Sequence, residues 1–339
     1  MVKHAYLLNR LTLVLLLVLV SGCSISGSLV EQKVTVIARD DDGKVEAIYF
    51  CPREDCGKAL TEFILSAEQS VHCAIYDLDI EDVINALEEK SKEIDVKLVV
   101  DTDNFEFVEH LDFVIQDDRS AIMHNKFCIV DGERISTGSM NPTVNGNEKN
   151  NNNLIIMESE ILAGNYEEEF DELWNRIFGK GENVGKPIIY LNETKVKNYF
   201  CPEDNCGEII EEELKGAEES IYFMLFSFTH IGIANEIVMR MHDGVEVKGI
   251  FEKRGSGSEY SRFKLLEFQG ADVRKDTNGG VMHHKVFIID NSIVITGSFN
   301  PSKNADTRND ENILIIHDKE VAEIYLEEFL YIWENYSEK

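Results

Sequence analysis

The hydrophobic and polar positions of the chain form a series of alternating helices and strands, and this series occurs twice. Each series begins with an amphipathic helix, an apolar strand, a second helix and a second strand. We predict these elements at Gly57–Ala67, Ser70–Tyr76, Ile80–Lys92 and Val96–Val100 in the first copy, and at Gly207–Ala217, Ser220–Phe226, Ile231–His242 and Val245–Phe251 in the second. Strands that alternate with helices indicate the α/β fold class, built from layered domains.

The second part of each copy is predicted to hold a hairpin, a closing strand and a long helix. The closing strands are Leu154–Met157 and Ile313–Ile316. Apolar residues then recur at i, i+4, i+7, i+8 and i+11, as on one face of a helix. They are Tyr166, Phe170, Leu173, Trp174 and Ile177 in the first copy, and Tyr325, Phe329, Ile332, Trp333 and Tyr336 in the second. We interpret this face as protein core rather than as a ligand site.

The length of 339 residues fits two domains of ordinary size, each large enough to bury its own core. We place the first domain at residues 45–182 and the second at 183–339, with a glycine-rich linker at 179–186. Residues 23–44 hold a small, polar tether and the start of the first copy.

Residues 1–22 differ in kind from the rest of the chain. Lys3 and Arg10 precede an apolar run at 11–20, which is too short for a bilayer because a spanning helix needs ~20 residues. We predict a secretory signal. The residues before Cys23 resemble a lipobox, which implies cleavage, lipidation of Cys23 and a lipid-anchored protein on the extracytoplasmic side of the cell membrane. The alternative, an N-terminal core helix, would lack caps and an amphipathic period.

The candidate chemistry lies in the hairpin of each copy. In the stretch 282–301, His283 and Lys285 stand two positions apart, so a strand points both side chains to one face. The returning strand then delivers Ser298 and Asn300. Ammonium, hydroxyl and amide groups are natural partners for a phosphate, and an imidazole can attack it or donate a proton. The first copy repeats the pattern 159 positions earlier, with His124, Lys126, Asp131, Ser139 and Asn141.

These residues resemble the phospholipase D superfamily, which is marked by two HxKxxxxD motifs that are each followed by GSxN. The resemblance covers nearly everything after about residue 45, and 214–333 looks like the compact bacterial nuclease branch, in which a single copy dimerises. It implies two similar α/β/α layered domains related by a pseudo-twofold axis, with the motifs meeting across that axis. It also implies no metal and no cofactor. We expect a monomer, because the two copies would form the pseudo-dimer within one chain.

The resemblance implies a covalent mechanism. One neutral imidazole attacks the phosphodiester and forms a phosphohistidine, while the other imidazole, protonated, gives its proton to the leaving oxygen. We predict that His124 and His283 are this pair. The groups expected to bind the phosphate oxygens are Lys126, Lys285, Asn141 and Asn300, helped by Ser139 and Ser298. Asp131 and Asp290 complete the motifs as candidate site residues, and we interpret them as buried structural partners at the strand ends.

One position of the site differs between the copies, since Glu311 in the second corresponds to Asn152 in the first. The resembling family commonly has a carboxylate here that orients the histidine of its own motif. We therefore expect Glu311 beside His283 and Asn152 beside His124. A carboxylate favours the charged imidazole, so His283 is predicted as the acid and His124 as the nucleophile. The alternative is that Glu311 pairs with Arg308 or caps a strand.

The chain has seven cysteines, of which Cys23 is the expected lipid site. Cys73 and Cys128 lie in apolar strands, and we interpret them as buried thiols. The other four repeat one spacing, as Cys51 and Cys56 and as Cys201 and Cys206. In an exported protein this spacing predicts two local disulfides, and the alternatives are a shared four-cysteine zinc site or free thiols.

The charge of the chain bears on its substrate. The formal net charge is −30, which repels a polyanion at long range, and no basic tail or patch is present in the sequence. The acidic composition and the membrane tether favour a phospholipid head group, whereas the compactness and the likeness to the nuclease branch favour an endonuclease. A third alternative is a lipoprotein that binds phosphorylated ligands without turnover. Residues 253–280 form a longer stretch than 102–122, and we expect them to shape substrate access rather than to pack.

Overall fold

A computed structural model describes residues 38–339, so the predicted signal, the polar segment 24–33 and Cys23 lie outside the described residues. The first copy forms a seven-stranded sheet with the order β2-β8-β7-β6-β3-β4-β5. Its strands are β2 (Lys44–Cys51), β3 (Ser70–Ile75), β4 (Asp95–Asp101), β5 (Val114–Asp117), β6 (Lys126–Val130), β7 (Arg134–Gly138) and β8 (Asn152–Glu158). Its helices are α1 (Cys56–Leu65), α2 (Glu81–Lys90), η1 (Thr102–Phe107), α3 (Val144–Glu148) and α4 (Glu160–Trp174).

The second copy repeats this strand order within a ten-stranded sheet, β1-β9-β10-β16-β15-β14-β11-β12-β13-β17. Its strands are β1 (Arg39–Asp41), β9 (Ile188–Leu191), β10 (Thr194–Cys201), β11 (Ser220–Leu225), β12 (Glu246–Phe251), β13 (Asp272–Asp276), β14 (Lys285–Ile289), β15 (Ile293–Gly297), β16 (Glu311–His317) and β17 (Ser337–Glu338). Its helices are α5 (Cys206–Lys215), α6 (Ile231–His242), α7 (Lys253–Ser256), α8 (Phe263–Gln269), α9 (Lys303–Thr307) and α10 (Lys319–Asn335). The predicted α/β fold class with two similar domains is confirmed.

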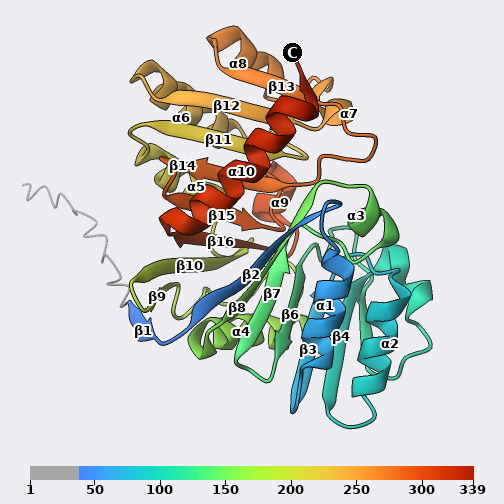
Figure 1. Cartoon of the computed structure of the whole chain (residues 1–339). Helices are drawn as coiled ribbons and strands as arrows, with labels where there is room; N and C mark the ends of the chain where they lie inside the picture. Colours follow the sequence, from blue (N-terminus) through green and yellow to red (C-terminus); the bar gives the residue numbers. More distant parts are fainter. Residues whose placement is uncertain (1–37) are drawn as a thin grey trace, which may run out of the picture. The chain divides into compact units, whose positions relative to one another are not determined.

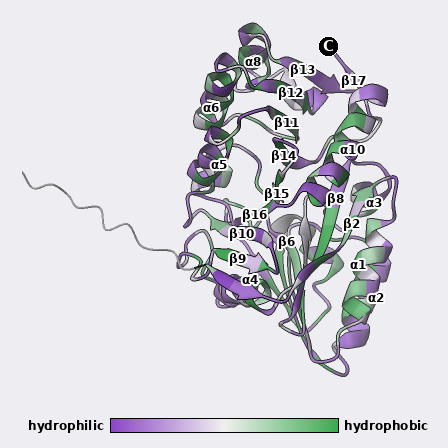
Figure 2. Cartoon of the chain, turned by 60° about the vertical axis from the view of Figure 1, so that its left-hand side comes forward, coloured by the Kyte–Doolittle hydropathy of each residue, from purple (hydrophilic) through white to green (hydrophobic). Residues whose placement is uncertain are grey.

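Helices cover both faces of each sheet. In the first copy α1 and α2 pack together on one face, and α4 packs on β3, β6 and β7 from the other. In the second copy α5 and α6 take the first role, and α10 crosses β11, β14 and β15 (Figure 1). Figure 2 shows hydrophobic residues along β6 and β8, whereas α5 and α6 alternate between hydrophobic and hydrophilic turns. Within residues 38–339, no helix has both the length and the apolar character that crossing a membrane requires.

The predicted aromatic face of the long helices lies in the core. Tyr166 and Phe170 of α4 and Tyr325 and Phe329 of α10 are all buried in one hydrophobic cluster that contains residues of both copies. Burial of this shared cluster therefore stabilises the association of the halves as well as each half. Two members of the predicted face are corrected: Ile177 and Tyr336 are exposed, because α4 ends at Trp174 and α10 ends at Asn335.

Hydrogen bonds between the halves follow a pseudo-twofold pattern. Nδ2 of Asn153 donates to Oγ1 of Thr296 at 2.7 Å, and Oγ1 of Thr137 donates to Oδ1 of Asn312 at 3.0 Å. Thr296 and Asn312 stand 159 positions after Thr137 and Asn153, so the same pair of residues meets twice, with the donor and acceptor roles exchanged. Reciprocal contacts of this kind are what a twofold axis produces.

The stretch 253–280 departs from expectation. It contains α7, α8 and the strand β13, and Phe263 and Leu266 are buried in the core of the second copy. The expectation that it does not pack is therefore wrong for these residues. Arg254 and Ser256, however, line a cavity of about 330 Å³.

The cysteines form three disulfides in the described residues. Cys51–Cys56 and Cys201–Cys206 are paired as predicted, which excludes the zinc and free-thiol alternatives. Cys73 and Cys128 are also bonded, so their interpretation as thiols is wrong. The reason is register, because the two residues stand opposite each other on the antiparallel strands β3 and β6, with their Cα atoms 4.1 Å apart.

Candidate active site

The two motif histidines lie where the halves meet. Each precedes a strand, His124 before β6 and His283 before β14. The backbone N–H of His124 donates to the carbonyl of Asp310 at 2.8 Å, and that of His283 donates to the carbonyl of Asn151 at 2.9 Å. Each motif therefore begins against the segment that leads into β16 or β8 of the opposite half.

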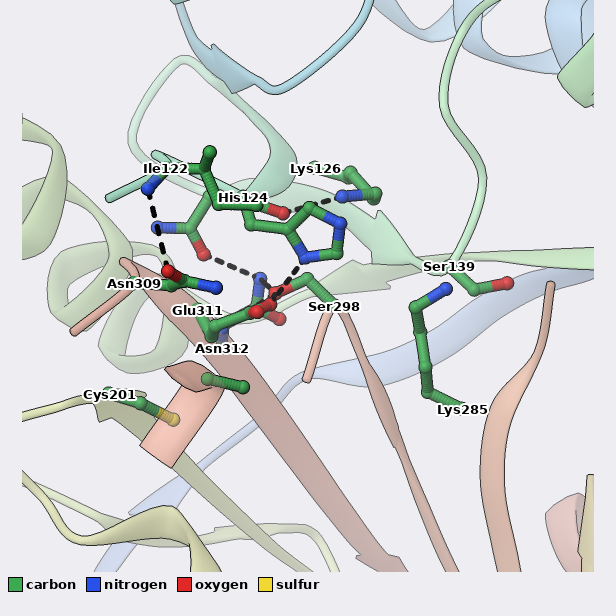
Figure 3. A network of polar contacts seen from close by, with 12 residues as sticks. Ile122, His124, Lys126, Ser139, Cys201, Lys285, Ser298, Asn309, Glu311 and Asn312 are labelled. Atoms are coloured by element: carbon green, nitrogen blue, oxygen red, sulfur yellow. Dashed lines mark hydrogen bonds and ion pairs between the residues drawn. The ribbon is translucent and has the colours of Figure 1, made fainter. Parts of the chain in front are cut away.

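This backbone pairing decides which residue orients each imidazole. Nδ1 of His124 lies 2.7 Å from Oε2 of Glu311. Figure 3 marks this contact with a dashed line. Nδ1 of His283 donates to Oδ1 of Asn152 at 2.8 Å. The expectation that Glu311 orients His283 and Asn152 orients His124 is therefore wrong. The alternative that Glu311 pairs with Arg308 is also excluded, because the carboxylate of Glu311 faces His124.

The serines of the motifs support these orienting groups. Oγ of Ser298 donates to Oε2 of Glu311 at 2.7 Å, and Oγ of Ser139 donates to Oδ1 of Asn152 at 3.2 Å. A hydroxyl has a single hydrogen to donate. Ser139 and Ser298 therefore position the orienting residues and do not have that hydrogen left for a phosphate, which corrects their predicted phosphate-binding role.

The two lysines lie beside the histidines of their own motifs. Nζ of Lys126 donates to the carbonyl of His124, and Nζ of Lys285 donates to that of His283, each at 2.6 Å. Each ammonium also lies over an aromatic ring, 5.0 Å from the centroid of Tyr76 and 5.3 Å from that of Phe226. Such contacts stabilise a cation.

Tyr76 and Phe226 were not predicted as site residues. Their rings also contact the imidazoles edge-on, with centroids 4.9 Å from His124 and 5.0 Å from His283. The sequence does carry a signal for them, since both follow Leu or Ile at the ends of equivalent strands, 150 positions apart.

Burial sets the electrostatics of the site. It lowers the pKa of Lys126 to about 7 and that of Lys285 well below its ordinary value. Burial, and then the two nearby lysines, lower the pKa of both His124 and His283 well below 6.5. Burial disfavours the charged form of each of these four groups. A nearby anion favours the charged form, so the four groups become good cations when they surround one. The site therefore has the charge pattern of a phosphate-binding pocket.

The His124–Glu311 pair is tightly coupled. Burial raises the pKa of Glu311 to about 8, against the opposing effects of Lys126 and Ser298. The two groups titrate as one pair, and the hydrogen of their bond lies on Nδ1 when Glu311 is ionised. When that proton is on Nδ1, the pair presents a neutral imidazole whose Nε2 lone pair can react.

Asp131 and Asp290 lie outside the site. Each follows the far end of the strand that its lysine begins, about 16 Å away at ~3.3 Å per residue. The carboxylate of Asp131 accepts the backbone N–H groups of residues 68–70, and that of Asp290 accepts those of 218–220. Both are half-buried loop anchors. Their placement among the catalytic residues is therefore wrong, and the structural interpretation holds.

Asn141 and Asn300 stand two residues after the motif serines, and both are half-buried. In the described part of the chain, Oδ1 of each amide is buried without a hydrogen-bond partner. Their predicted contact with the phosphate oxygens stays a prediction.

Comparison with known proteins gives the family. The domain described as "Cardiolipin synthase, PLD-like domain" matches residues 60–174 and 210–333, once in each half. A phospholipase D of Rickettsia felis is 34% identical over 191 residues, which cover 54% of this chain and 96% of the relative. A mitochondrial cardiolipin hydrolase of Xenopus tropicalis is 30% identical over 154 residues, or 44% of this chain and 71% of the relative.

A solved structure extends the fold likeness over both halves. The phosphatidylserine synthase of Haemophilus influenzae Rd KW20 matches with a TM-score of 0.66, covering 87% of this chain and 88% of its own, at 12% identity. The fold and the site together define an enzyme that acts on phosphodiesters. The chain belongs to the phospholipase D superfamily, as its two motifs predict, and it is a phosphodiesterase of that superfamily.

Proposed function

We propose that the protein cleaves its phosphodiester through a covalent phosphohistidine. Nε2 of one imidazole attacks phosphorus, the bond from phosphorus to the leaving oxygen breaks, and that oxygen takes the proton of the other imidazole. Water, or an alcohol in a transfer reaction, then attacks phosphorus and gives its proton to the second imidazole as the P–N bond breaks. The observation that carries this proposal is that both histidines are held through Nδ1 from the opposite half, which leaves Nε2 for reaction.

We assign His124 as the nucleophile and His283 as the acid. An attacking imidazole gains positive charge, and the carboxylate of Glu311 at 2.7 Å stabilises that charge. The amide of Asn152 orients His283 without adding charge, so the imidazolium there gives up its proton readily. The roles are those expected from the sequence, although each orienting residue serves the histidine of the opposite half.

We favour a phospholipid head group as the substrate. The cavity of about 330 Å³ lies next to Phe226, whose ring contacts His283. Its walls include Phe228, Phe251 and Val281, and its two charged members are Arg254 and Glu252. Largely apolar walls with one cation and one carboxylate suit an amphiphilic ester better than the backbone of a polyanion. The relatives named phospholipase D and cardiolipin hydrolase point the same way.

The test compares two substrate classes, phospholipid vesicles and plasmid DNA, on the purified chain. We expect release of head group from phosphatidylcholine or cardiolipin vesicles, and loss of that release in His124→Asn. Cleavage of plasmid DNA with no release from vesicles would establish the endonuclease alternative. Binding of vesicles or of plasmid DNA without turnover of either would establish the phosphate-binding alternative.

We also propose that the enzyme works outside the cytoplasm, anchored to the cell membrane through Cys23. The sequence before Cys23 supports this, and so do the three disulfides of the described residues, since disulfides persist in oxidising compartments. Membrane fractionation tests the anchor: Cys23→Ser should move the protein from the membrane fraction to the soluble one. Unchanged fractionation would reject lipidation of Cys23.

A further inference from the structure

A buried carboxylate of the second copy is neutralised by a cation from the first. Glu328 of α10 is 1% exposed, and it forms an ion pair with the guanidinium of Arg53. The same guanidinium lies over the ring of Tyr331, 4.3 Å from its centroid. Arg53 belongs to the loop closed by the first local disulfide, so the contact joins the two halves. A buried carboxylate of this kind needs a partner cation.

At the pseudo-twofold equivalent of this contact, a carboxylate takes the place of the cation. Glu169 and Glu172 of α4 stand 159 positions before Glu328 and Tyr331. Glu203 stands two residues after Cys201, as Arg53 stands two residues after Cys51. The position of the guanidinium is therefore occupied by a third carboxylate. Oxygen atoms of these three glutamates all lie within 4.8 Å of one another.

An unpartnered amide oxygen supplies an independent observation at the same place. Asn165 is 2% exposed, and its Nδ2 donates to the carbonyl of Lys186 at 2.9 Å and to Oδ1 of Asn198 at 2.7 Å. Its Oδ1 is buried and has no hydrogen-bond partner among the described residues. Asn165 lines a cavity of about 30 Å³ together with Glu169, Glu172 and Glu182, and Glu203 of the cluster stands outside this lining. This space is close to the volume that one water or ion occupies.

We propose that Glu169, Glu172 and Glu203 bind a hard divalent cation, with Ca²⁺ preferred, where the other half uses the guanidinium of Arg53. Carboxylate and amide oxygens are the ligands that Ca²⁺ takes, and its flexible coordination suits side chains from separate elements.

The bound cation would link the two halves beside the active site. Glu169 and Glu172 belong to the first copy, whereas Glu203 belongs to the second. Glu169 also accepts a hydrogen bond of 3.3 Å from Nδ2 of Asn125, the residue after His124. The cation site is thus a structural clamp, separate from the reacting groups.

Calcium titration of the purified, EDTA-treated and dialysed chain tests the proposal. We expect one saturable Ca²⁺ site by calorimetry, and a thermal unfolding midpoint that rises with Ca²⁺. Glu172→Gln should weaken the binding by ~10-fold or more, because the number of charged ligands sets calcium affinity. Glu203→Arg should abolish both effects, since it rebuilds the ion pair of the other half.

A matched control in the second half separates this site from general charge effects. Arg53→Lys keeps the cation beside Glu328 and should leave the calcium response unchanged, and circular dichroism checks the fold of every variant. Wild-type protein without saturable binding of Ca²⁺, Mg²⁺ or Mn²⁺ would overturn the proposal. So would calcium binding that survives in both Glu172→Gln and Glu203→Arg.

Discussion

Replacing Glu311 by glutamine tests how His124 is activated. Glu311 is fully buried, and its Oε2 contacts both His124 and Ser298 at 2.7 Å. Glutamine keeps the size of the side chain and an acceptor oxygen, but it removes the charge. Hydrogen bonds to charged groups contribute ~1.5–3 kcal/mol and neutral ones ~0.5–1.5 kcal/mol. The loss of ~1–2 kcal/mol in the transition state lowers kcat/KM roughly 5- to 30-fold.

The pH dependence of Glu311→Gln shows which histidine the carboxylate serves. The carboxylate favours the charged form of His124, so its removal lowers the pKa of that imidazole. The nucleophile must be neutral, and the acidic limb of the kcat/KM profile should therefore move to lower pH, while the basic limb stays in place. The matched variant Asn152→Asp adds a carboxylate to His283 instead. It should move the basic limb to higher pH, because the acid then keeps its proton longer.

Acid-quenched single turnovers with a labelled substrate complete this assay. We expect the trapped phosphoryl group on His124, at reduced rate in Glu311→Gln and with the fold unchanged by circular dichroism. An unchanged rate and acidic limb would leave Glu311 with a structural role only. Label on His283 would refute the assignment of the nucleophile.

Four further outcomes are expected. Residues 34–182 and 183–339 expressed separately should be inactive until mixed, because each imidazole takes its Nδ1 partner from the other half; turnover by one half alone would contradict this. Turnover measured well below the thermal unfolding midpoint should survive EDTA. A loss of turnover that a divalent ion restores would reject a metal-free reaction. Removing the disulfide Cys73–Cys128 should lower the free energy of unfolding, measured in denaturant melts, by ~4 kcal/mol, and removing Cys51–Cys56 should lower it by only ~2 kcal/mol, because the first disulfide closes the longer loop. Equal losses would argue against this entropic explanation. Asp131→Asn should lower the free energy of unfolding by ~1–3 kcal/mol but leave kcat near wild type, and a lost kcat in folded protein would return Asp131 to the catalytic site.

The sign of the Asp131 effect with pH follows from its contacts. Burial raises the pKa of Asp131, but the backbone N–H groups of residues 68–70 outweigh it and lower the pKa overall. A carboxyl whose pKa is depressed by folding contributes stability above its unfolded pKa, and that stability is lost as the pH falls through the folded value. Acid titration of the unfolding free energy should therefore separate wild type from Asp131→Asn at neutral pH and bring them together at low pH.

The sequence predicts elements and site residues correctly where one copy can be compared with the other. The repeat by itself predicts the longer helices (α1, α2, α4, α5, α6 and α10), the central strands, His124, His283 and the local disulfides, but not the short helices η1, α3, α7, α8 and α9. Short outer strands such as β5 and β13 escape prediction, because their four or five residues are mostly half-exposed and carry little hydrophobic period.

The contacts that the sequence does not predict are those that depend on placing one segment against another. Cys73 and Cys128 are 55 residues apart, and only strand register brings them together. The partner of His124 comes from 187 positions away, because the segments before β6 and β16 pair across the halves. A motif read within one copy cannot contain this information, since the exchange is a property of the assembled pseudo-dimer.

Duplication within one chain explains why the site can be asymmetric. In a symmetric dimer of single copies, both histidines would receive the same orienting residue, because one sequence supplies both subunits. The Rickettsia felis relative is matched over 96% of its length by 54% of this chain, so it is about one copy long. Here the two copies have diverged at the position of Asn152 and Glu311, and again at that of Arg53 and Glu203. The first difference gives the two imidazoles different charges in their surroundings, which is the condition for one fixed nucleophile and one fixed acid.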